Sequence, residues 1–357
     1  METIKDLIYF DNNRTTRVDD DVLKSMQQVE DDGKVDSTVA YQLKIKALNK
    51  IATLLNCSVE QLVFTNSTSD GIHLGLNAAY QAKKSRGNHI IMSCCEHPAV
   101  FKTVDKLKES GAEVSYLSID KEGLIDLDEL KQLIKHNTII VSVMSANNET
   151  GVIQPIEAIS AICKNKDILF FSDASQYAGK MRSDVKDLNY DLMAFSAHKN
   201  YGPSGIGVLF SGNPDLLSRV EGLDIESSEN LMRIVGMAKM AELCHENFWE
   251  NNIHISRIKN YFEHQLLDLE GFRINGSTRH RLYNTSNVLF KDNRILKLKD
   301  KYQFMDNTHR ESFTLSAMGL TEDEIKSSFR FSFGKYNTLE QVQELVKDIK
   351  LLHNVND

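Results

Sequence analysis

The residue of this sequence with the clearest chemical signal is Lys199, which stands in the run Ser196-Ala197-His198-Lys199-Asn200-Tyr201-Gly202-Pro203. A lysine amine attacks a carbonyl compound when its pKa is lowered, and the site must also have room for a planar cofactor. The small residues and the glycine around Lys199 meet the second requirement. The segment therefore predicts a lysine that forms an imine with a carbonyl cofactor.

Other polar groups also follow apolar runs, and each has an ordinary structural explanation when taken alone. Thr68 and Ser69 open a predicted helix, where backbone N–H groups and hydroxyls suit a phosphate but also make a common N-cap. Asp173 could cap a helix or pair with a ring nitrogen. His97 and the run Asn147-Asn148-Glu149 follow two further apolar runs, where a structural histidine and a turn would explain them.

Three of these groups together match the requirements of pyridoxal 5'-phosphate. Lys199 would form the imine, and Asp173 would supply the carboxylate that the pyridinium nitrogen needs. The turn at Thr68 and Ser69 would bind the phosphate. Because all three lie just after apolar runs, the sequence indicates a pyridoxal-phosphate enzyme.

Short apolar runs alternate with helical periods through the first two thirds of the chain, which favours an α/β fold with a largely parallel sheet. Ligands of such sheets bind beyond the carboxyl ends of the strands. From about Cys244 a charged helical stretch runs to about Leu269. We expect a large domain over residues 15–244 and a small α+β domain of residues 1–14 and 245–357. The seven predicted strands are Leu62–Phe64, His89–Met92, Val114–Leu117, Thr138–Val143, Ile168–Phe171, Leu192–Phe195 and Ile206–Phe210.

The composition narrows the classes of partner and location. A net charge of -8 argues against nucleic acid and anionic membranes as general partners. The N-terminus has no apolar signal-peptide core, and no run of about twenty apolar residues predicts a membrane span. Five cysteines without C-x-x-C spacing predict reduced thiols in a cytoplasmic protein.

The motifs around these residues resemble those of the cysteine desulfurase family, within class V of the fold-type I pyridoxal-phosphate aminotransferases. The resemblance runs from Ile8 to Gly207 and resumes in shorter segments up to Gly334. Its strongest stretches are Glu96-His97-Pro98-Ala99-Val100, Ala146-Asn147-Asn148-Glu149-Thr150-Gly151-Val152-Ile153-Gln154-Pro155 and Ser196 to Pro203.

The resemblance implies a role for each matching position. Lys199 would form the internal aldimine and move protons at Cα, and His97 would stack on the pyridine ring. It also implies a homodimer and a small amino acid as the substrate. The resemblance also implies that Asp173 pairs with the ring nitrogen and that Gln176 binds the phenolic oxygen. The residues implied to bind the phosphate are Thr68, Ser69, Ser196, His198 and Ser228. Those implied to bind the substrate are Asn13, Asn148 and Arg330, the last through a bidentate fork on the α-carboxylate.

The sequence departs from the family in two segments. Desulfurases of this family carry a nucleophilic cysteine on a loop that corresponds to Lys291–Ser316, and here that stretch is shorter and contains no cysteine. The thiolate is the atom that takes up sulfur as a persulfide, and neither serine nor methionine replaces it. A glycine- and arginine-bearing segment of the family is reduced here to Glu226-Ser227-Ser228-Glu229-Asn230, where Ser228 matches a phosphate-binding threonine.

Three hypotheses for function remain at this point. The first is a desulfurase-like lyase in which Cα deprotonation leads to chemistry at Cβ. The second is a desulfurase that passes sulfur to Cys94, Cys95 or the thiol of a sulfur-acceptor protein, although vicinal cysteines at a strand end are more often buried apolar residues. The third is a cofactor-binding scaffold in a sulfur-transfer assembly. Retention of the complete set of cofactor residues favours an enzyme.

Overall fold

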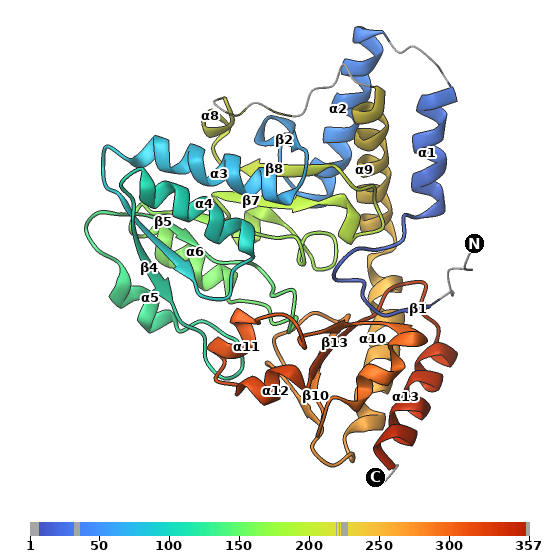
Figure 1. Cartoon of the computed structure of the whole chain (residues 1–357). Coiled ribbons are helices and arrows are strands. Elements are labelled where there is room, and N and C mark those ends of the chain that lie inside the picture. The colour runs from blue at the N-terminus through green and yellow to red at the C-terminus, as the bar shows by residue number, and fades with distance from the viewer. Residues whose placement is uncertain (1–6, 32–35, 219, 221, 223–227, 355–357) are drawn as a thin grey trace.

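The core of the fold is a seven-stranded sheet, seen at the centre of Figure 1. The computed structural model describes residues 7–31, 36–218, 220, 222 and 228–354. Only β8 runs antiparallel to its neighbours, and the other pairs are parallel. The mainly parallel seven-stranded sheet predicted from the sequence is confirmed. In spatial order the strands are β2 (Leu62–Thr65), β8 (Gly207–Ser211), β7 (Leu192–Ser196), β6 (Leu169–Asp173), β5 (Thr138–Ser142), β3 (His89–Ser93) and β4 (Glu113–Leu117).

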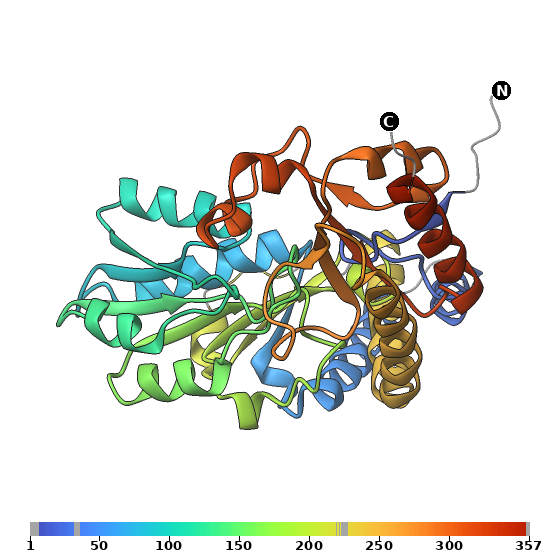
Figure 2. The same cartoon turned by 90° about the horizontal axis from the view of Figure 1, so that it is seen from below.

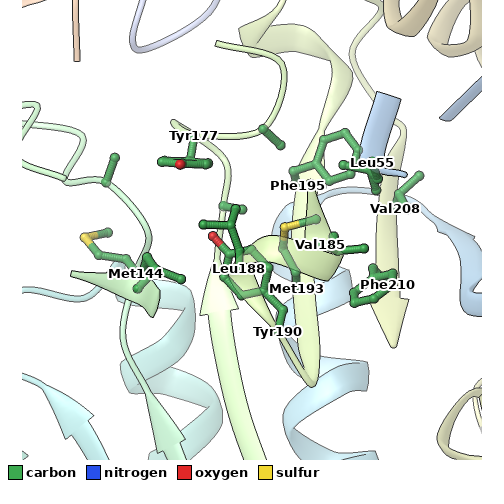
Figure 3. Close-up of a cluster of buried hydrophobic side chains, with 14 of the residues drawn as sticks. Leu55, Met144, Tyr177, Val185, Leu188, Tyr190, Met193, Phe195, Val208 and Phe210 are labelled. Carbon is green, nitrogen blue, oxygen red and sulfur yellow. The ribbon is translucent and has the colours of Figure 1, made fainter. Parts of the chain in front are cut away.

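Both faces of this sheet are covered because successive side chains of each strand point to opposite sides. Ile90 packs with helices α3 (Thr68–Lys83) and α4 (Pro98–Glu109), whereas Ile91 packs with helices of the other face. Those helices are α2 (Ser37–Leu55), α6 (Ile156–Lys164) and α7 (Val185–Leu188). Figure 2 shows the two helical layers on either side of the strands, and Figure 3 shows the packing of Met193, Phe195, Val208 and Phe210 on one face.

A helical layer that the sequence patterns did not predict lies beside β2. It consists of α1 (Asp20–Asp31), α2 and α9 (Ser228–Glu246), in which α1 and α2 both pack against α9. Leu231 of α9 is buried with Ala40 of α2 and Val29 of α1. The short elements of the same half are η1 (Val59–Gln61), α5 (Leu127–Leu133), η2 (Ala197–Lys199) and α8 (Pro214–Leu217).

A second, antiparallel sheet lies at the other end of the molecule, in the orange and red part of Figure 1. Its order is β12 (Met305–Asp306), β13 (Ser328–Ser332), β10 (Thr285–Leu289) and β9 (Arg273–Ile274). Helices α10 (Phe248–Leu266) and α13 (Leu339–Asn354) complete an aromatic core that includes Phe262, Phe331 and Phe333. The remaining elements are β1 (Ile8–Tyr9), η3 (Arg294–Asp300), β11 (Tyr302–Gln303), α11 (Phe313–Ala317) and α12 (Glu322–Lys326).

The prediction of a single helical stretch from about Cys244 to about Leu269 is wrong in one respect. The chain forms two helices here, because Asn247 leaves helical geometry between α9 and α10, with φ -99° and ψ 14°. Within the described ranges, no helix combines the length and apolar character that a membrane span requires.

Candidate active site

Lys199 lies in a tight turn that starts where β7 ends. Tyr201 takes a left-handed backbone conformation with φ 66°, and its N–H donates to Thr16 Oγ1 at 2.7 Å. A side chain at Gly202 would bring its Cβ within 2.6 Å of Ala197 Cβ, so only glycine fits this position. The turn therefore fixes the backbone of Lys199 against the N-terminal segment.

Lys199 is half-buried, and burial lowers the pKa of its amine. The carboxylate of Asp173 acts in the opposite direction, and the guanidinium of Arg330 adds to the lowering. A lysine with a lowered pKa is the form that attacks a carbonyl carbon, because a larger share of it is neutral.

Asp173 ends β6, the strand that pairs with β7, and it is 5% exposed. Its Oδ1 accepts a hydrogen bond from the Ser175 N–H at 2.9 Å. The hydroxyl of Ser175 donates in turn to Thr68 Oγ1 at the start of α3, also at 2.9 Å. The carboxylate and the N-terminus of α3 are thereby held in one local network beyond the carboxyl ends of β6 and β2.

His97 is the N-cap residue of α4, and its Nδ1 accepts a hydrogen bond from the Ala99 N–H at 3.2 Å. This contact assigns the proton of the neutral ring to Nε2. Burial lowers the pKa of His97 most, Asp173 opposes that shift, and Lys199 and Arg310 add to it. The charges of Lys199 and Asp173 therefore both act on the imidazole of His97.

Three of the predicted phosphate ligands differ in their surroundings. Ser69 is exposed in the first turn of α3, where free N–H groups favour an anion. Ser196 is completely buried, and its Oγ has no hydrogen-bond partner among the residues that the structure describes. Burial, followed by the charges of Lys199 and Lys180, lowers the pKa of His198 to about 4. The side chain of Ser228 lies outside the described residues.

The unpartnered hydroxyl of Ser196 tests whether these residues fit pyridoxal phosphate. A buried hydroxyl without a partner costs free energy, which a bound group with acceptor oxygens would recover. An exposed helix N-terminus with Ser69 stands in the same part of the fold, so the donor set matches a phosphate group. The residues that are present fit the cofactor.

Arg330 and Asn148 meet where β13 faces the loop after β5. Arg330 Nη1 donates to the Asn148 carbonyl oxygen at 2.7 Å, and Nη2 forms a buried ion pair with Asp11. Asn13 Nδ2 donates to the same carbonyl at 3.2 Å. Arg330 Nε is buried and has no partner. The structure thus brings the three predicted substrate residues together. The Nη2 group of the guanidinium is already paired with Asp11.

Sequence reasoning did not single out three of the buried polar residues at this site. Asp11 is the ion-pair partner of Arg330. Glu96 is buried, and its Oε1 accepts from the Met144 N–H at 2.6 Å. Lys180 donates to Gln176 Oε1 at 2.6 Å. In the sequence, Lys180 could have been noticed because it is the single charged residue in the run Ala174–Met181.

The segment that lacks the family's cysteine is tied to the Asn147-Asn148-Glu149 motif. Ser312 Oγ donates to Glu149 Oε2 at 2.5 Å, and Asn147 Nδ2 donates to Thr314 Oγ1 at 3.1 Å. Arg310 Nη2 lies 3.7 Å from Glu149 Oε1. Two side-chain hydrogen bonds and one ion pair therefore hold this segment against the site.

None of the five cysteines is an activated thiol. Cys95 is buried and Cys94 is half-buried, and burial raises the pKa of both. Cys57, Cys163 and Cys244 also have pKa values raised by burial, each to about 12. Because a thiol must ionise to attack sulfur, these surroundings disfavour persulfide formation on the chain itself.

Comparison with known proteins places this geometry in a family. The model of the aminotransferase class V family matches residues 8–345. Cysteine desulfurase IscS of Colwellia psychrerythraea is 34% identical over 376 residues, which cover 96% of this chain and 92% of the relative. Cysteine desulfurase IscS of a Neisseria meningitidis serogroup A strain is also 34% identical, over 97% of this chain and 92% of the relative.

Solved structures agree with these relatives. A NifS-like protein superimposes with a TM-score of 0.87 and 30% identity, covering 97% of this chain and 99% of the other. A NifS-like protein from Rickettsia africae gives a TM-score of 0.84 at 25% identity, over 98% and 100%. SspA in complex with cysteine gives 0.78 at 28% identity, over 93% and 100%.

The fold and the comparisons define a pyridoxal-phosphate enzyme of the class V aminotransferases. Within that class, the chain belongs to the cysteine desulfurase family. Fold class, cofactor and family predicted from the sequence are confirmed.

Proposed function

We propose that this enzyme cleaves the Cβ–S bond of a small L-amino acid by elimination, with L-cysteine as the first candidate substrate. The proposal is carried by residues 291–316. They contain no cysteine, and Ser312 and Thr314 fasten them to the Asn147-Asn148-Glu149 motif. Because the raised pKa values of Cys94 and Cys95 disfavour a thiolate, sulfur would leave as sulfide rather than as a persulfide on this chain.

The central groups in this proposal are Lys199, His97 and Asp173. Lys199 carries the cofactor and takes the proton from Cα of the substrate. His97 holds a proton on Nε2, from which it protonates the departing sulfur. Asp173 pairs with the ring nitrogen. When bound, pyridoxal phosphate takes up the electron pair that remains at Cα.

The binding groups follow from the same proposal. The phosphate of the cofactor would accept hydrogen bonds from Thr68, Ser69, Ser196, His198 and Ser228. The phenolic oxygen of the cofactor would accept one from Gln176. The substrate's α-carboxylate would face the guanidinium of Arg330, beside Asn148 and Asn13. The unpartnered Nε of Arg330 supports this, since an incoming carboxylate would satisfy it.

The elimination balances without an external reductant. The Cβ–S bond breaks, sulfide leaves with a proton, and hydrolysis of the remaining unsaturated amino acid gives pyruvate and ammonium. Desulfuration by sulfur transfer would instead give alanine and would place sulfur on a thiol. The two reactions are therefore distinguished by their three-carbon product.

The deciding experiment incubates the purified holoenzyme with L-cysteine and measures sulfide, pyruvate and alanine separately. Elimination predicts equal amounts of sulfide and pyruvate, no alanine, and loss of both products in Lys199→Ala. Alanine with no pyruvate would overturn elimination in favour of sulfur transfer. Alanine that persists in the double variant Cys94→Ala/Cys95→Ala would exclude those two thiols as the sulfur acceptor.

Absence of all three products would contradict L-cysteine as the substrate. The same assay with cysteine sulfinate, serine and alanine then separates another substrate from a cofactor-binding scaffold. Spectral change of the bound cofactor with any of them would show catalysis at Cα. No change with all four would support the scaffold.

We also propose that the enzyme is a cytoplasmic homodimer. Leu23 of α1 and Val39 and Tyr41 of α2 are exposed by 47%, 41% and 58%, and pairing of two chains would cover such apolar side chains. Sedimentation of the holoenzyme at micromolar concentration would give twice the mass of the chain, and a monomer would contradict the proposal.

A further inference from the structure

Lys180 is a buried cation in the turn that follows β6. It is 5% exposed, and its Nζ donates to Gln176 Oε1 at 2.6 Å and to Asn13 Oδ1 at 3.4 Å. Both partners are neutral amides, and among the described residues no carboxylate forms an ion pair with it. A buried ammonium group without a counter-charge costs free energy, so its presence requires a function that a neutral side chain would not serve.

The ammonium group of Lys180 and the carbonyl oxygen of Asn13 together fix which way the amide of Gln176 points. An amide can present either its oxygen or its NH2 group to a given partner. Lysine has only donors, so Gln176 Oε1 must face Lys180. Gln176 Nε2 donates one hydrogen to the Asn13 carbonyl oxygen at 2.9 Å, and its second hydrogen remains available.

The second partner of Gln176 is itself fixed by surrounding hydrogen bonds. Asn13 Oδ1 accepts from Asn284 Nδ2 at 3.0 Å, and Asn13 Nδ2 donates to Thr285 Oγ1 at 2.9 Å. The Asn13 N–H donates to Ser332 Oγ at 2.9 Å. The amide of Gln176 is therefore held at both ends by groups that cannot turn to suit it.

We propose that Lys180 is a positioning residue of the cofactor site, which holds the Gln176 amide so that its free N–H faces the phenolic oxygen of pyridoxal phosphate. This inference rests on the proposed role of Gln176. With the amide reversed, its oxygen would face the phenolic oxygen and would repel the ionised form.

The surroundings of Lys180 act against its positive charge, so its hydrogen bond to Gln176 carries the inference. Burial lowers its pKa well below the ordinary value, and the cations Lys199 and Arg330 lower it further, while Cys244 opposes them. Lys180 also contributes to the lowered pKa of His198.

The test is a double-mutant cycle on the holoenzyme, read without substrate from the pH midpoint of the cofactor's long-wavelength absorbance. We expect Lys180→Met to raise this midpoint by about one pH unit. Gln176→Leu should raise it by a similar amount. The double variant should equal Gln176→Leu alone, because Lys180 acts through that amide.

The matched control is Lys259→Met. It removes another buried lysine, which pairs with Glu263 on α10, beside the aromatic core. It should leave the midpoint unchanged. If Lys180→Met does not fold, Lys180→Leu serves in its place, since leucine also has no hydrogen-bond donor for Gln176 Oε1. The same rise is expected for it.

An unchanged midpoint in the Lys180 variant would overturn the inference, and so would fully additive effects. Additive effects would mean that Lys180 acts by charge alone. An unchanged midpoint in Gln176→Leu would overturn the proposed role of Gln176 instead. Because no substrate is present, the result stands whether or not the enzyme eliminates sulfide from cysteine.

Discussion

Arg330 Nη2 donates a hydrogen bond to Asp11 Oδ1, and both side chains are only 4% exposed. This buried ion pair connects β13 to the segment after β1. It also means that one side of the guanidinium is already occupied by a carboxylate, and Nε is left without a partner.

Removal of Asp11 should therefore destabilise the fold. In Asp11→Ala the guanidinium of Arg330 stays buried without its counter-charge, and we expect the free energy of unfolding to fall by about 3–5 kcal/mol. Urea unfolding monitored by circular dichroism measures this change. The control is Asp21→Ala, which removes an exposed partner of Lys24 and should change stability by less than about 1 kcal/mol. Equal losses in both variants would show that the buried pair contributes little.

Loss of the Ser196 hydroxyl should weaken cofactor binding without weakening the fold. A hydrogen bond to a charged group contributes about 1.5–3 kcal/mol, so Ser196→Ala should bind pyridoxal phosphate about 10- to 100-fold more weakly. Equilibrium dialysis measures the affinity. Ser142→Ala is the matched control, because Ser142 Oγ is also buried and unpartnered but lies within β5. Unchanged affinity in Ser196→Ala would remove Ser196 from the phosphate site.

The contact between Ser312 and Glu149 should control how often the 307–316 segment opens. Ser312→Ala removes a hydrogen bond to a carboxylate, and the open population should rise about 10-fold. The rate of trypsin cleavage after Arg310 measures that population. Ser316→Ala, an exposed change on α11, should leave the rate unchanged. A rate equal to wild type in Ser312→Ala would mean that other contacts hold the segment.

The carboxyl of Glu96 should make stability depend on pH. Burial, with Asp173 adding to it, raises the pKa of Glu96 from 4.5 to about 8. Between these values the folded protein keeps a proton that the unfolded chain has lost, so wild-type stability falls as pH rises through this window. Glu96→Gln cannot ionise and keeps the acceptor for the Met144 N–H.

Urea unfolding at a series of pH values tests this expectation. The difference in unfolding free energy, Glu96→Gln minus wild type, should increase from pH 4.5 to about 8 and then stay constant. A difference that is the same at every pH, or that decreases over this window, would contradict it.

The sequence by itself determined the large sheet and the chemical character of the site. Runs such as His89–Met92 and Leu192–Phe195 are apolar on both faces, and that pattern arises only where helices cover both sides of a sheet. The motif around Lys199 and the carboxylate at Asp173 then indicated pyridoxal phosphate. The absence of a loop cysteine was also readable from the residues alone.

Only the tertiary structure decided how the polar residues are paired. The partner of Arg330 is Asp11, 319 positions away, and Lys180 holds an amide that is itself bonded to Asn13. Local patterns carry no information about such contacts, because they depend on how separate strand ends meet. The arrangement of α1, α2 and α9 was missed for a related reason: α1 and α2 both pack on α9, which follows them by about 170 positions or more in the sequence.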